Sequence, residues 1–211
     1  ADKHEIFLDV VAYMDYRNVD EIKKEYSKFI NKDTGKLIIT YTGRMIEEKG
    51  VPRLIEAFKN LDSKYENLEL DLAGDGPILE KIIQENKDVK NIKVLGKISH
   101  QEVMELLGKT NIFVNPSHFS EGLPTTILEA GMMKCAVVAT PMGGTTEIIT
   151  DDNIGYICGF ETSEIQEKIE KIINDKEKMK KLGINIKEKV EKDFSWNTTA
   201  KKIATTIKYS K

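Results

Sequence analysis

Short apolar runs alternate with segments of helical periodicity along most of the chain, and this alternation restricts the fold more than any other feature. Runs rich in apolar and β-branched residues occur at 36–43, 68–74, 91–96, 111–117, 135–140 and 154–159. Between them, apolar residues recur at helical spacing, as in "VPRLIEAFKNL" (51–61) and "SHQEVMELLGKT" (99–110). Strands that alternate with crossover helices predict a parallel sheet covered on both faces. We therefore expect an α/β fold with an open parallel sheet of about six strands.

The two ends of the chain differ from this central part. The segment 1–35 begins with a potential strand and continues as a polar, partly helical stretch, which we interpret as a linker leading into the domain. The domain itself is expected to span 36–193. From Thr162 onward the pattern is helical, with breaks near 174–175 and 193–194. A length of 211 residues fits one large domain or two small ones.

Composition and charge exclude several classes of protein. The net charge is −3, and the basic residues are spread along the chain, so a nucleic-acid partner is not indicated. No apolar run approaches the length of about 18 residues that a membrane span needs, and no signal peptide opens the chain. Cys135 and Cys158 are the only cysteines. Two free thiols fit a reducing compartment, so we expect a cytoplasmic protein.

Charged and glycine residues follow the predicted strands, where ligands of open α/β sheets bind. Arg44 and Lys49 flank the loop after the first strand, in "YTGRMIEEKG". A guanidinium and an ammonium placed there suit a diphosphate, although a solvated basic pair is an equally simple interpretation. Gly74 and Gly76, in "AGDGP", provide a tight turn and a chance of close backbone approach to a ligand. They match only a fragment of a dinucleotide-binding motif.

The stretch "HFSEGLPTTILEAG" (118–131) combines a helix start with two carboxylates, Glu121 and Glu129. Pro124 suits the first turn of a helix, and the backbone amides of Thr125 and Thr126 then favour phosphate oxygens. A carboxylate accepts hydrogen bonds and therefore matches sugar hydroxyls. The alternative roles are ordinary ones: Glu121 as a helper of the helix dipole and Glu129 as a solvated helix residue.

Other polar motifs carry less information. Gly143 and Gly144, followed by a short helical segment, repeat the design of a strand end with glycines, and a flexible loop explains them equally well. The histidines and cysteines lack metal-ligand spacing, and His100 is interpreted as a surface residue. No Asp-x-Asp pair occurs, which argues against a metal-bridged diphosphate site.

The ordered set of these motifs resembles the group 1 glycosyltransferases (family 4, retaining, GT-B fold). The set comprises "TGRMIEEKGVPRLIEAF", "LAGDGP", "IKVLGKIS", "NPSHFSEGLPTTILEAG", "AVVATPMGGTTEII" and "NIGYI". The resemblance covers about 36–160 and implies a Rossmann-like domain that forms the C-terminal half of a GT-B fold. The tail 194–211 resembles the C-terminal helix of that family, which crosses back toward the other domain.

The resemblance also implies roles for individual residues. Arg44 and Lys49 are expected on the diphosphate, Glu121 near the donor sugar, and Glu129 on the ribose hydroxyls. Backbone amides after the first glutamate place Gly122, Leu123, Thr125 and Thr126 in the site, and the base is expected near Lys97 and Ile98. Many family members have glycine where Pro124 stands, which puts a backbone contact at that position in doubt.

The expected function is thus the nucleotide-sugar half of a hexosyltransferase that uses a UDP- or GDP-sugar and no metal or other cofactor. The partner is a missing N-terminal acceptor domain, and peripheral membrane contact through that half stays open. We expect little transferase activity from this chain alone. Two alternatives remain: a non-catalytic nucleotide-sugar binding subunit, and an NAD-dependent oxidoreductase with a similar sheet. The second predicts a full Gly-x-Gly-x-x-Gly after the first strand, where "TGRMIEEKG" places charges instead.

Overall fold

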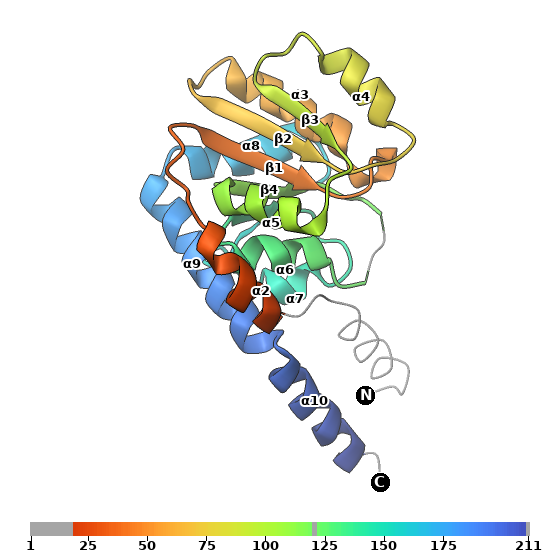
Figure 1. Cartoon of the computed structure of the whole chain (residues 1–211), viewed down its shortest axis with the longest axis vertical. Coiled ribbons are helices and arrows are strands. Elements are labelled where there is room, and N and C mark those ends of the chain that lie inside the picture. The colour runs from red at the N-terminus through yellow and green to blue at the C-terminus, as the bar shows by residue number, and fades with distance from the viewer. Residues whose placement is uncertain (1–18, 120–121, 210–211) are drawn as a thin grey trace.

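A computed structural model describes residues 19–119 and 122–209 of the chain. Its centre is a six-stranded sheet in the order β3-β2-β1-β4-β5-β6 (Figure 1), in which all neighbouring strands are parallel. The strands are β1 Leu37–Thr42, β2 Leu68–Ala73, β3 Ile92–Gly96, β4 Ile112–Asn115, β5 Ala136–Ala139 and β6 Tyr156–Ile157. This arrangement confirms the predicted α/β architecture and its six parallel strands.

Helices connect the strands and continue to the end of the described chain. They are α2 Val19–Tyr26, α3 Val51–Asp62, α4 Leu79–Asn86, α5 His100–Lys109, α6 Thr125–Met132, α7 Thr145–Ile148, α8 Thr162–Ile173, α9 Lys176–Asp193 and α10 Trp196–Tyr209. Two short 3₁₀ turns, η1 Ser27–Phe29 and η2 Glu47–Lys49, complete the set. A capping box stands at the start of α5, with Ser99 and Glu102 bonding each other's backbone amides.

Each face of the sheet is covered by its own hydrophobic cluster. Side chains that alternate along a strand point to opposite faces, so Val114 of β4 packs in one cluster and Phe113 in the other. The first cluster joins the sheet to α3, α4 and α8, and the second joins it to α2, α5 and α6. Helix α9 contributes to both, through Leu182 on one face and Ile186 on the other. Burial on both faces explains why the strands are almost continuously apolar.

Strand order determines where a ligand fits. The chain moves outward from β1 to β2 and β3, then returns across the sheet to β4 on the other side of β1. The chain after β1 therefore leads to α3 on one face of the sheet, and the chain after β4 leads to α6 on the other. In open α/β sheets, this reversal creates a crevice outside the carboxyl ends of the strands.

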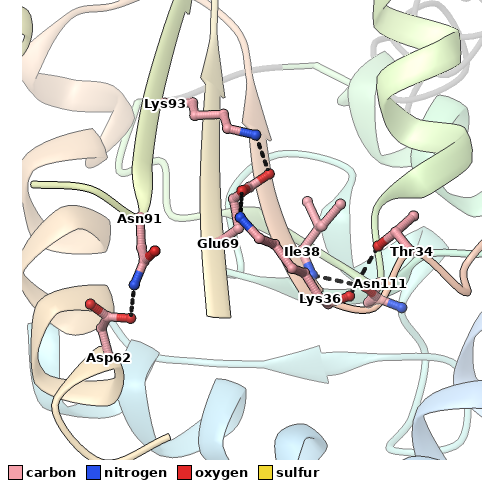
Figure 2. Close-up of polar contacts among 8 residues, drawn as sticks. All are labelled: Thr34, Lys36, Ile38, Asp62, Glu69, Asn91, Lys93 and Asn111. Atoms are coloured by element: carbon pink, nitrogen blue, oxygen red, sulfur yellow. Dashed lines mark hydrogen bonds and ion pairs between the residues drawn. The ribbon is translucent and has the colours of Figure 1, made fainter. Parts of the chain in front are cut away.

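The amino-terminal ends of the strands carry polar side chains that are paired with one another (Figure 2). The buried carboxylate of Glu69 lies between Lys36 and Lys93, with 2.6 Å separating its Oε1 from Lys93 Nζ. Asn111 accepts a hydrogen bond from the backbone amide of Ile38 at 2.8 Å. These contacts fix the approach of the chain to the sheet, and they occupy the polar groups at this end.

The described part of the segment before residue 36 packs on the sheet domain. Val19 and Ile22 of α2 are buried in the second cluster, beside α5, α6 and α9. At the other end of the chain, α10 continues from α9 and extends beyond the sheet domain (Figure 1). The division into 1–35, 36–193 and 194–211 stays a prediction. The potential strand expected near the first residue lies outside the described residues.

Candidate functional site

The loop after β1 is held in one shape by backbone contacts. Tyr41 donates a hydrogen bond from its hydroxyl to the carbonyl oxygen of Arg44 at 2.8 Å. The turn η2 ends at Gly50, whose φ of 73° lies in the left-handed region. A Cβ at Gly50 would lie 2.1 Å from the carbonyl oxygen of Pro116, so the loops after β1 and β4 touch at this point. The amide of His118 also donates to the carbonyl of Glu48 at 2.8 Å.

Two cations meet over one aromatic ring at this junction. The guanidinium carbon of Arg44 is 5.3 Å from the centre of the Phe119 ring, and the Lys49 ammonium is 5.5 Å from it. Phe119 comes from the β4–α6 loop and is partly exposed. Its ring attracts both cations electrostatically. The loops after the two central strands thus bring together the two residues expected to bind a diphosphate.

The environment of Lys49 weakens its hold on a proton. The Lys49 side chain is buried, and its ammonium interacts with the exposed Arg44. Burial, and next the nearby charge of Arg44, together lower the pKa of the Lys49 ammonium to about 8. Two positive groups held together in a partly desolvated place favour an anion between them.

A cavity of about 360 Å³ opens beside Arg44, outside the carboxyl ends of β1, β2 and β3. It is lined in part by Gly43, Arg44, Gly74, Lys97 and Ile98. Four of these five residues are predicted site residues, drawn from three separate loops. The structure therefore brings them together at one edge of the sheet.

Gly74 lines this cavity and lets the loops after β1 and β2 pack closely. A Cβ at this position would lie 1.7 Å from the carbonyl oxygen of Gly43, and the φ of Gly74 is 146°. Both the close approach and the backbone conformation therefore require glycine. The loops after β1 and β2 are consequently packed backbone against backbone beside the cavity.

The start of α6 faces the same edge of the sheet. Helix α6 follows Pro124, and the first-turn amides of Thr125 and Thr126 lack partners within the helix, as in every α-helix. The preceding loop is fixed to the β5–α7 loop, because Gly144 donates its amide to the carbonyl of Gly122 at 2.9 Å. Leu123 packs there as well, since a Cβ at Gly144 would lie 2.8 Å from its Cδ1. Glu121 lies outside the described residues.

Glu129 is a buried carboxylate, not a solvated helix residue. It is 6% exposed on the second turn of α6. Its Oε1 is 3.2 Å from Nε2 of His100, the first residue of α5. The interpretation of His100 as a plain surface residue was therefore incomplete, because its side chain is only 28% exposed and contacts a predicted site residue. Since His100 follows Ile98 by two residues, this contact lies close along the chain to the cavity.

Two residues of this site were missed at the sequence level, Phe119 and His100. Phe119 stands between the β4 end and Glu121, and its contacts depend on the fold of two loops. His100 follows an N-cap, where polar residues are common for structural reasons alone. Nothing in the local pattern marks either residue as part of a ligand site.

The described residues show neither a metal cluster nor a membrane helix. In the ranges 19–119 and 122–209, no three His, Cys, Asp or Glu side chains are placed to hold a metal ion together. The helices in those ranges are too short or too polar to cross a bilayer. Independence from metal and a cytoplasmic location both stay predictions.

The comparison with known families identifies the chain. A sequence profile described as "Glycosyl transferases group 1" matches residues 22–189. The chain belongs to this family.

Similar curated proteins include glycosyltransferases of an archaeon and a bacterium. An uncharacterized glycosyltransferase of Methanocaldococcus jannaschii is 37% identical over 161 residues, which cover 74% of this chain and 43% of that protein. The capsular polysaccharide biosynthesis glycosyltransferase CapM of Staphylococcus aureus is 29% identical over 182 residues, or 83% of this chain and 46% of that protein. The chain thus spans less than half the length of these two relatives.

Solved structures of other proteins share the fold of this chain. The C-terminal domain of the group 1 glycosyl transferase LpcC from Francisella tularensis is 25% identical, with a TM-score of 0.72. The alignment covers 85% of this chain and 99% of that domain. Anabaena HepE, solved in complex with UDP and glucose, has the same fold with a TM-score of 0.74 at 21% identity, over 92% of this chain and 55% of that one. This group 1 chain is therefore a GT-B C-terminal domain with a Rossmann-like sheet.

Proposed function

We propose that the chain is the donor-binding half of a retaining glycosyltransferase that transfers a hexosyl group from a UDP- or GDP-sugar to an acceptor hydroxyl. One observation carries the proposal above all others. Arg44 and Lys49 converge on Phe119 beside a cavity at the carboxyl edge of the sheet, at the point where the strand order reverses. Membership of the group 1 family and the UDP present in the HepE complex support the same substrate class.

Each part of the site has a role in this proposal. The diphosphate lies between Arg44 and Lys49, with its oxygens directed at the α6 start, where Thr125 and Thr126 offer amides. The ribose hydroxyls donate to Glu129, and the base enters the cavity near Lys97 and Ile98. Gly122 and Leu123 border the sugar. Glu121 acts near the donor sugar, where it stabilises charge at the reacting carbon or positions that carbon.

The chemistry follows from where charge develops. When the bond between the anomeric carbon and the diphosphate oxygen breaks, its electron pair goes to the diphosphate, and negative charge grows there. Fixed cations and helix-end amides stabilise that charge most in the transition state. The acceptor hydroxyl then forms the new bond on the same face of the sugar, which gives retention of configuration.

The test is a ligand screen by thermal shift, followed by calorimetry of the hits. The chain is mixed with millimolar UDP-, GDP- and ADP-sugars, and with NAD as the representative of the alternative function. We expect a uridine or guanosine diphosphate sugar to stabilise the chain. In calorimetry, Arg44→Ala, Lys49→Ala or Glu129→Ala is expected to lower the affinity for that ligand at least about fivefold.

The matched control is Lys81→Ala, because Lys81 is an exposed lysine paired with Glu47 at 3.6 Å and does not line the cavity. This variant is expected to bind like the unaltered chain. Stabilisation by NAD alone would favour the oxidoreductase alternative. Equal losses in Lys81→Ala and Lys49→Ala would show that general charge, and not this site, is responsible.

Little transfer by the chain alone remains part of the proposal. The relatives are more than twice as long as the matched region, and an acceptor site is expected in the other half. Appreciable transfer from a nucleotide sugar to an added acceptor by this chain alone would contradict it.

A further inference from the structure

His100 is held in a defined position next to Glu129. It opens α5 directly after the N-cap Ser99, whose capping box with Glu102 fixes the first turn of the helix. The ring also meets Tyr26 of α2 edge-on, with ring centres 5.6 Å apart and an angle of 84° between the planes. The imidazole thus contacts both an aromatic ring and a carboxylate, each from a different helix.

The hydrogen bond between these residues has a defined direction. An ionised carboxylate only accepts, so Nε2 of His100 donates to Oε1 of Glu129 across 3.2 Å. A buried carboxylate is costly unless hydrogen bonds stabilise it, and Glu129 is almost fully buried. The contact fixes one oxygen of the carboxylate, and it leaves acceptor capacity on that group for other donors.

We propose that His100 is a positioning residue, whose imidazole holds the Glu129 carboxylate in the orientation that receives the ribose hydroxyls of a nucleoside diphosphate. This inference rests on the function proposed above, because it assigns Glu129 to the ribose. Tyr26 restrains the ring by its edge-on contact. Through it, a helix that precedes the first strand of the sheet contributes to the ligand site.

The test compares ligands that differ only in their ribose hydroxyls. The full 211-residue chain is titrated with UDP, GDP and their 2′,3′-dideoxy counterparts by calorimetry. For the preferred base, His100→Ala is expected to weaken binding of the ribonucleotide about tenfold and to leave binding of the dideoxynucleotide within about twofold. His100→Gln keeps an N–H donor and is expected to retain ribonucleotide affinity within about threefold.

A double-mutant cycle tests whether His100 acts through Glu129. In a Glu129→Gln background, adding His100→Ala is expected to change ribonucleotide affinity less than about twofold, because coupled residues are not additive. The control is Gln101→Ala, a neighbour in the same turn whose exposed side chain bonds Glu105 at 2.9 Å. It is expected to bind all ligands like the unaltered chain.

The outcomes separate this inference from the proposed function. An unaltered chain that binds neither UDP nor GDP overturns both. An unaltered chain that binds, while His100→Ala weakens ribonucleotide and dideoxynucleotide equally or affects neither, overturns only the role of His100. Circular dichroism checks the fold of each variant. If His100→Ala is unfolded, His100→Leu, which also lacks an N–H donor, takes its place in the same comparison with the same expected selectivity.

Discussion

The unusual acidity of Lys49 makes a sharp prediction about pH and diphosphate binding. Its ammonium has a pKa of about 8 in the free chain, lowered first by burial and then by Arg44. A bound diphosphate adds negative charge beside it and raises that pKa, so protonation and binding reinforce each other. Affinity for UDP or GDP is therefore expected to be constant at low pH and to fall as the pH rises through about 8.

The magnitude follows from the fraction of chains whose Lys49 is charged. With a pKa of about 8, roughly one chain in eleven carries the ammonium at pH 9, and about nine in ten carry it at pH 7. If the ligand binds only the charged form, the apparent Kd rises about tenfold over those two pH units. The terminal phosphate, with a second pKa near about 6, is already ionised throughout this range and contributes little.

Calorimetric titration at constant ionic strength from pH 6.5 to 9.5 measures this profile. Lys49→Arg carries a charge that does not titrate, so its affinity is expected to stay level up to pH 9. Lys49→Met is expected to bind weakly and with little pH dependence. Arg44→Met removes a charge that lowers the pKa of Lys49, so its remaining affinity should begin to fall at a higher pH. A level profile for the unaltered chain, or the same fall in Lys49→Arg, would refute the reasoning.

Three further predictions concern other residues of the fold and the site. Phe119→Ala removes the ring that holds both cations in place and is expected to weaken UDP or GDP binding about fivefold, because the cations must then be ordered when the ligand binds; calorimetry that finds unchanged affinity would count against a role for the ring. Gly74→Ala forces a methyl group into the adjacent loop and is expected to lower the free energy of unfolding by about 2–4 kcal/mol in urea, and an unchanged midpoint would contradict the tight contact. Burial, and next the charge of Glu69, raise the pKa of the Asp71 carboxyl to about 6. The folded chain therefore binds more protons than the unfolded chain between about pH 4 and 6, and its stability should fall across that window by about 2 kcal/mol, a fall that Asp71→Asn should abolish in pH-dependent urea unfolding.

The sheet could be predicted because its signals are local. A buried parallel strand needs apolar residues on both faces, and "KLIIT" or "AVVA" shows this directly. The start of α5 can be predicted in the same way, since Ser99 and Glu102 have the spacing of a capping box. Strand ends then indicated where Arg44, Gly74, Lys97 and Ile98 would gather, because parallel strands share one carboxyl edge.

The rest of the site depends on contacts between distant segments. His100 and Glu129 are 29 positions apart, and they meet only because α5 and α6 cover the same face of the sheet. The low pKa of Lys49 results from burial and from the proximity of Arg44. Neither can be predicted from the residues next to Lys49 in the sequence. Phe119 lies in the β4–α6 loop, and it reaches Arg44 because that loop is hydrogen-bonded to the loop after β1.

A crystal structure of the chain in complex with UDP or GDP, whichever binds more tightly, tests the central claim most directly. The account predicts diphosphate oxygens within hydrogen-bond distance of the Arg44 guanidinium and the Lys49 ammonium, and ribose hydroxyls on the Glu129 carboxylate. A nucleotide bound elsewhere on the domain, with no contact to Arg44 or Lys49, would contradict it.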